Sequence, residues 1–127
     1  MALACIVGCG GDGGQKPRPI SGPAKEAATV VQRLQDATAK RDFKTICRDL
    51  FSRRVREQAG GKDCPRFVKR QAGDVRRPRI EVRGITIRRD SASVRVLTRA
   101  AGQAPARETI ELVREGGRFR IASLGGS

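Results

Sequence analysis

The spacing of the hydrophobic residues changes once along this chain, near Arg79, and that change limits the fold more than any other feature. Before Arg79, apolar residues recur every three or four positions, which is typical of amphipathic helices. After Arg79 they recur at every second position, which is typical of strands with one buried face. Helices followed by strands that short turns connect predict an α+β domain, with three N-terminal helices packed on a four-stranded antiparallel sheet.

Three helices are predicted in the first half of the chain. The first begins at Pro23, which suits a first helical turn, and runs to about Arg41. Its apolar stripe is Ala27, Val30, Val31, Leu34 and Ala37. The second is expected to be capped by Asp42 and to end at Gly60-Gly61. Its expected buried face is Phe43, Ile46, Cys47, Leu50, Phe51 and Val55. The third is expected to be capped by Asp63 and to run from Cys64 to about Ala72, with Phe67 and Val68 available to the core.

The first predicted strand contains a change of parity. Ile80 and Val82 alternate with polar residues, but after Gly84 the apolar positions become Ile85 and Ile87. Such a shift at a glycine predicts a β-bulge, which bends the strand. Across the sheet, the residues expected to face the helices are Ile80, Val82, Ala92, Val94, Val96, Thr98, Ile110, Leu112, Phe119 and Ile121. Gly116-Gly117 predicts a tight hairpin before the last strand.

The chain is strongly basic, with 27 Lys and Arg against 13 Asp and Glu and a formal net charge of +14. A field of this sign attracts anionic lipid headgroups or acidic polymers. Because an unpaired guanidinium is costly to bury, four arginines of the strands are expected to point outward. These candidate contacts for an anionic surface are Arg79, Arg83, Arg95 and Arg99. The alternative interpretation is a solvated outer face of the sheet.

No catalytic constellation is found in the sequence. The chain has no His, Tyr or Trp, so acid–base catalysis would have to use Asp or Glu. Glu81, Glu108 and Glu111 are expected on the polar faces of strands. Without His, and without a CxxC pair, a zinc site is not expected. We therefore predict a protein that is not an enzyme and that holds no metal or cofactor.

Two cysteines of the helical half are candidates for a disulfide. Cys47 and Cys64 lie 17 positions apart, with Cys64 at the expected start of the third helix. Either they form a disulfide or they remain two buried thiols. An oxidising compartment favours the disulfide, which we predict.

The N-terminal stretch Ile6-Val7-Gly8-Cys9 resembles a bacterial lipobox, in which the cysteine takes a diacylglyceryl group. Only eight residues precede Cys9 and none is Lys or Arg, so residues 1–8 look like a truncated signal segment. Residues 9–22 are rich in Gly and Pro and are interpreted as a tether, and residues 23–127 as the folded domain. The resemblance implies lipidation of Cys9 and anchoring to the outer face of the bacterial cell membrane. The alternatives are a start codon further upstream, or an accidental match in a frayed N-terminus.

The order of motifs resembles a known superfamily. A first helix ends in Lys40-Arg41-Asp42-Phe43, and the last strand follows Glu115-Gly116-Gly117 and reads Arg118-Phe119-Arg120-Ile121. This order is similar to that of small exported bacterial proteins of the nuclear-transport-factor-2-like (cystatin-like) superfamily, over roughly residues 23–123. The resemblance implies a sheet that curls around the helices, often with a cavity at its wide end. Phe119 stands where Trp is commoner, and no catalytic residue of the superfamily can be transferred to this chain.

Three function classes follow from these observations. The first is an anchored, non-catalytic module that binds a small ligand in the cone or another component of the cell envelope. The second is a soluble basic protein that binds nucleic acid. It is disfavoured because no recognition motif is present and the Phe residues fall on buried stripes. The third is a cavity enzyme that lacks the usual catalytic residues.

Overall fold

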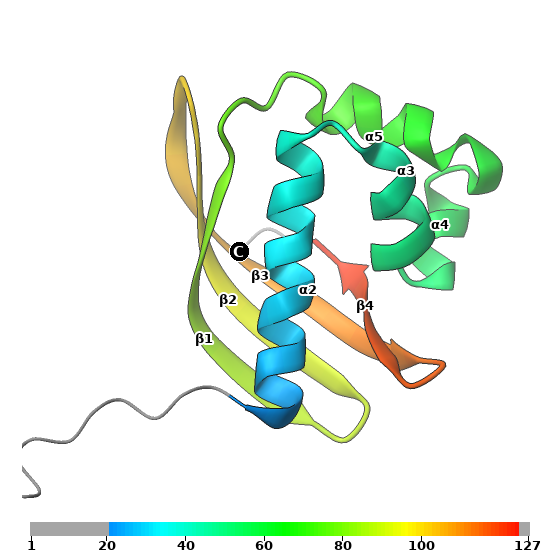
Figure 1. Cartoon of the computed structure of the whole chain (residues 1–127), viewed down its shortest axis with the longest axis vertical. Coiled ribbons are helices and arrows are strands. Elements are labelled where there is room, and N and C mark those ends of the chain that lie inside the picture. Colours follow the sequence, from blue (N-terminus) through cyan, green and yellow to red (C-terminus); the bar gives the residue numbers. More distant parts are fainter. Residues whose placement is uncertain (1–20, 125–127) are drawn as a thin grey trace, which may run out of the picture.

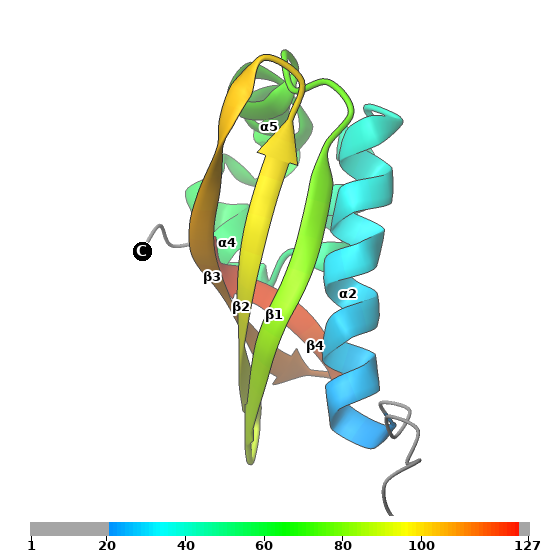
Figure 2. The same cartoon turned by 90° about the vertical axis from the view of Figure 1, so that its left-hand side faces the viewer.

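The helices of this protein lie on one face of a four-stranded antiparallel sheet, and the opposite face of β1, β2 and β3 is open (Figures 1 and 2). The computed structural model describes residues 21–124. The helical elements are α2 (Gly22–Ala39), α3 (Phe43–Thr45), the π-helical turn η1 (Ile46–Leu50), α4 (Arg53–Gln58), the 3₁₀ turn η2 (Gly61–Asp63) and α5 (Cys64–Ala72). The strands are β1 (Arg79–Arg88), β2 (Ser91–Ala100), β3 (Gln103–Glu115) and β4 (Arg118–Ser123). The α+β class and the four-stranded antiparallel sheet are thus confirmed.

Helix α2 has the predicted apolar stripe. Its buried residues are Ala27, Val30, Val31, Leu34 and Ala37. A proline stands in its first turn, as expected, although the helix begins one residue earlier, at Gly22. Side chains at this spacing share one side of a helix, so the stripe packs on the sheet along most of the helix length (Figure 1).

The predicted second helix is broken, and the three-helix prediction is wrong in this detail. Asp42 does cap its start, because the Asp42 carboxylate accepts from the backbone N–H of Thr45 at 3.2 Å. The chain then becomes extended at Phe51, which forms a parallel bridge with Ile121 of β4. The Ser52 N–H donates to the Ile121 carbonyl at 2.9 Å, and the buried Ser52 hydroxyl then caps α4. Pairing with β4 therefore replaces helical hydrogen bonds at this point.

Helix α5 has the predicted bounds, Cys64–Ala72. The predicted cap is wrong, because Asp63 stands at the capping position without a side-chain hydrogen bond to the helix. Val68 is buried, whereas Phe67 is 37% exposed. Of the two residues of α5 that were expected in the core, only Val68 is therefore buried.

The bulge predicted in β1 is present. The pairing of β1 with β2 shifts register between Val82 and Gly84, so Arg83 is the extra residue. On both sides of the shift the apolar residues of β1 lie opposite inward residues of β2: Val82 opposite Val96, and Ile85 opposite Val94. The bulge thus keeps both halves of β1 turned toward the helices.

The inward face of the sheet is buried on its central strands and less so on β1. The buried inward residues are Ala92, Val94, Val96, Ile110, Leu112, Phe119 and Ile121. Ile80 and Ile85 are partly buried against this core. Val82 and Ile87 share this face by register, so the expected direction of Val82 is confirmed, although each of the two side chains is 38% exposed. β1 is an edge strand, and the exposure of Val82 and Ile87 shows that the helices cover it incompletely.

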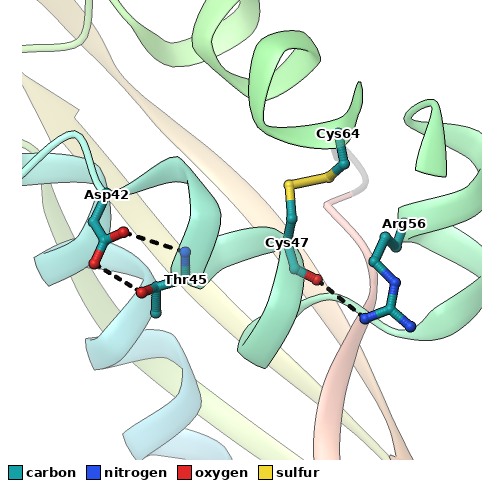
Figure 3. The surroundings of a disulfide bond; sticks show 5 residues. All are labelled: Asp42, Thr45, Cys47, Arg56 and Cys64. Carbon is teal, nitrogen blue, oxygen red and sulfur yellow. Dashed lines mark hydrogen bonds between the residues drawn. A yellow bond between two sulfur atoms is a disulfide. The ribbon is translucent and has the colours of Figure 1, made fainter. Parts of the chain in front are cut away.

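The predicted disulfide joins Cys47 of η1 to Cys64 at the start of α5 (Figure 3). The two Cα atoms are 6.0 Å apart, within the usual range for a disulfide, and both side chains are buried. The nearby Arg56 donates from Nη1 to the Cys47 carbonyl at 3.5 Å (Figure 3). The disulfide therefore ties α5 to η1, in the helical segment that ends at Phe51.

We expect the disulfide to stabilise the fold by about 3 kcal/mol, because it closes a loop of this length in the unfolded chain. The double variant Cys47→Ala with Cys64→Ala should lose about this free energy of unfolding in urea titrations. Wild-type protein in reductant should lose a similar amount, which serves as the control. A urea midpoint that is unchanged by reductant would contradict the prediction.

Candidate ligand cavity and arginine hollow

A cavity of about 480 Å³ lies between α5, the C-terminal half of α2 and the adjoining ends of β1, β2 and β3. We call it the inner cavity. Its wall is mainly aliphatic and aromatic, and includes Leu34, Ile46, Phe51, Val68, Val96 and Ile110. Phe67 and Leu124 also line the inner cavity while remaining 37% and 45% exposed. Apolar side chains that stay accessible at a cavity offer a surface for an apolar ligand.

The inner cavity contains one carboxylate, that of Glu108. Glu108 pairs with Val96 across the sheet and therefore lies on the inward face, so its expected place on a polar strand face is wrong. The Thr98 hydroxyl donates to Glu108 Oε2 at 2.8 Å and lies 3.3 Å from the Ala106 carbonyl oxygen. Glu108 has the same parity as Ile110 and Leu112, and this was the signal available in the sequence.

Two of the predicted outward arginines stand beside the inner cavity. Arg79 and Arg99 lie opposite each other on β1 and β2, are exposed, and also line the cavity. Arg99 Nε donates to Glu81 Oε2 at 2.9 Å. This hydrogen bond is the main reason why the pKa of Glu81 is held below its ordinary value, and the charges of Arg99, Arg83 and Arg79 act in the same direction. The charge of Arg99 is therefore partly balanced.

The other two predicted arginines line a hollow on the outer face of the sheet. Arg83 and Arg95 are both exposed, as expected, and they meet Arg107 of β3 there. This arginine hollow has a volume of about 480 Å³, and its wall also includes Leu97 and Thr109. Arg107 is not among the predicted arginines, although it alternates with the inward Glu108 and so belongs to the outer face. The structure thus divides the four predicted arginines into two pairs and adds a fifth.

Gly84 determines how Arg95 lies. The two residues are paired across β1 and β2, and a Cβ at position 84 would clash with the Arg95 guanidinium. The guanidinium therefore occupies the space over the bulge that any other residue would fill. Among the described residues, no hydrogen bond or ion pair engages the side chain of Arg95 or that of Arg107. Arg83 Nη2 lies 3.3 Å from Glu81 Oε1, with both side chains exposed.

Residues 21–124 contain no group of three or more metal-ligating side chains. No helix in this part of the chain is long and apolar enough to cross a membrane. Cys9, the candidate lipidation residue, the expected signal segment 1–8 and residues 9–20 of the expected tether 9–22 lie outside the described residues, and Gly22 of that tether belongs to α2.

Comparison with known proteins identifies the fold. No protein-family model matches the chain, and no curated protein matches it either. Among solved structures, one similar to this chain is a Campylobacter jejuni protein provisionally named an NTF2-like transpeptidase. The match has a TM-score of 0.52 and 17% sequence identity, and it covers 76% of this chain and 97% of the other. A likeness at this level of identity is one of fold, and the fold of this chain is NTF2-like.

Proposed function

We propose that this chain is a membrane-anchored extracytoplasmic lipoprotein whose domain binds a small, largely apolar ligand without transforming it. The inner cavity is the observation that carries this proposal. Ligand sites typically have volumes of about 300–1,000 Å³, apolar walls and a few polar groups that orient the ligand. The inner cavity, at about 480 Å³, meets each of these criteria.

The polar groups of the inner cavity suggest the chemistry of the ligand. Glu108 accepts from Thr98 with one oxygen, and a carboxylate has acceptor sites left for a second donor. Gln71 and Gln103 also line the cavity and each can donate or accept. We therefore propose a ligand with an apolar body and at least one N–H or O–H group that reaches Glu108.

Two features support export to an oxidising compartment. The first is the Cys47–Cys64 disulfide, because disulfides persist in exported proteins and are rare in reducing compartments. The second is Cys9, which follows Ile6-Val7-Gly8 in a lipobox-like order. A diacylglyceryl group supplies two acyl chains, which suffice for stable anchoring.

A hydroxyl beside a carboxylate favours acyl transfer as a second candidate function. Thr98 Oγ1 lies 2.8 Å from Glu108 Oε2, a distance at which a carboxylate can act as general base for a hydroxyl nucleophile. The Campylobacter jejuni protein carries a provisional transpeptidase name, but its likeness to this chain is one of fold. We rank acyl transfer second because the Thr98 hydroxyl also has the Ala106 carbonyl oxygen as an alternative acceptor.

Lipidation is tested by expressing the natural reading frame, with any upstream codons, in a bacterium. We expect the protein to fractionate with membranes and Cys9→Ser to release it, because the serine hydroxyl cannot form the thioether. Cys5→Ser, a matched change in the same segment, should leave the protein on the membrane. Membrane association that survives Cys9→Ser would contradict the proposed anchor.

Ligand binding is tested with N-phenyl-1-naphthylamine, an uncharged dye whose fluorescence rises in apolar surroundings. The probe is titrated into the full oxidised chain carrying Cys5→Ser and Cys9→Ser, which prevents lipidation. We expect saturable binding, and Ala106→Phe should weaken it about ten-fold, a loss of about 1.4 kcal/mol, because the ring occupies part of the inner cavity. Ala39→Phe is the control, since Ala39 is exposed on α2 and does not line the cavity.

Equal binding by the Ala106→Phe and Ala39→Phe variants would contradict the inner cavity as the site. Hydrolysis of a p-nitrophenyl ester that Thr98→Val abolishes would contradict the non-catalytic assignment and favour acyl transfer. Both measurements use the chain that carries Cys5→Ser and Cys9→Ser, so neither result depends on the membrane anchor.

A further inference from the structure

The arginine hollow on the outer face of the sheet is separate from the inner cavity. Along an antiparallel strand, successive side chains point to opposite faces, so the two sites use alternate residues of the same strands. On β3, Arg107 and Thr109 line the hollow, whereas Ile110 lines the inner cavity. Val96 and Glu108 contribute to the wall of both, but both are inward residues by register, and the Glu108 carboxylate accepts from Thr98 on the inward face.

We propose that the arginine hollow binds the phosphate group of an anionic phospholipid headgroup. Three arginines, Arg83, Arg95 and Arg107, line one hollow of about 480 Å³. The guanidinium fork matches the oxygens of a phosphate group and binds them with two parallel hydrogen bonds. The structure thus brings together the donors that such an anion requires.

The charges around the hollow leave it positive. Two carboxylates of the outer face lie on the strands near the hollow: Glu81, which is hydrogen-bonded by Arg99 and approached by Arg83, and Glu111, which accepts from the Ser93 hydroxyl. Within residues 21–124, no carboxylate is paired with Arg95 or Arg107. Two of the three guanidinium groups therefore retain their full donor capacity for a ligand.

The bulge in β1 holds the site in shape. Gly84 carries no side chain, so the Arg95 guanidinium can lie over the strand at this point, while the extra residue of the bulge, Arg83, lies beside it. A side chain at position 84 would displace the Arg95 guanidinium from the hollow. This arrangement makes the hollow a positioned set of donors rather than a scatter of surface charges.

The choice of a lipid headgroup as the source of the phosphate rests on the proposed anchor at Cys9. Ser21, the first described residue, is twelve positions after Cys9, so the domain would lie within about 40 Å of the lipid surface. At that range anionic headgroups are the most concentrated phosphate groups available to the hollow. A leaflet with negative surface potential also attracts basic residues by itself.

The test measures sedimentation of the full oxidised chain, carrying Cys5→Ser and Cys9→Ser, with vesicles of phosphatidylglycerol and phosphatidylcholine. We expect binding that requires phosphatidylglycerol and that falls with salt, because salt screens the attraction. Gly84→Ala should weaken it about two- to five-fold at unchanged net charge and unchanged thermal stability, because only the end of the flexible Arg95 side chain must move. The pair Arg95→Gln with Arg107→Gln should weaken it more than five-fold.

The control pair is Arg88→Gln with Arg89→Gln, which removes the same charge from exposed positions outside the hollow. If the control pair loses as much binding as the hollow pair, or if Gly84→Ala binds like the wild type, the proposal is overturned. It is also overturned if an oligothymidine strand binds more tightly than the vesicles and loses affinity with the same substitutions. The dye titration on the same samples reports the inner cavity, so failure of the headgroup site and failure of the proposed function remain distinguishable.

Discussion

The β-bulge at Val82–Gly84 is the constraint on which both faces of the sheet depend. Side chains alternate strictly along a strand, so without an extra residue one half of β1 would turn its apolar side chains outward. The register shift keeps Val82 opposite Val96 and Ile85 opposite Val94. It also turns Arg83 outward and brings Gly84 beneath Arg95. A single inserted position therefore supports the core on one side and the arginine hollow on the other.

The two sites differ because the helices cover only one face of the sheet. On the covered face, α2, α5 and η1 close over aliphatic residues and leave the inner cavity. On the open face, neighbouring residues of the same strands are exposed arginines. Val96 is buried and Arg95, its neighbour, is exposed, so one peptide bond separates the two environments. The disulfide adds a covalent tie between η1 and α5, two of the elements that enclose the inner cavity.

Patterns among residues close together in the sequence predicted most of the helices and strands. The stripe of α2, the bounds of α5, the alternation in β2 and the bulge at Gly84 all follow from residues close together in sequence. The break at Phe51 and Ser52 did not follow, because it depends on pairing with Ile121, seventy positions away. The exposure of Val82 depends on how far the helices reach across an edge strand, which local periodicity does not determine.

For the candidate sites, the position of a residue in the alternation of its strand predicts the face of the sheet better than its residue type does. Arg83 and Arg95 were predicted to point outward and do so, whereas Arg107 was overlooked although its parity on β3 places it on the same face. Glu108 was assigned to a polar face because it is charged, yet its parity with Ile110 places it inward. Arg107 lies at the same hollow as Arg83 and Arg95 because of the register between β2 and β3, and the sequence alone does not determine that register.

The central claim is that one sheet carries two ligand sites on opposite faces, and side-chain NMR tests it most directly. Two titrations are compared, one with N-phenyl-1-naphthylamine and one with the short-chain lipid dihexanoyl phosphatidylglycerol. The account predicts that the dye shifts the methyl signals of Val68 and Ile110, and that the lipid shifts the Nε–Hε signals of Arg83, Arg95 and Arg107. A single common set of shifted signals for both ligands would contradict it.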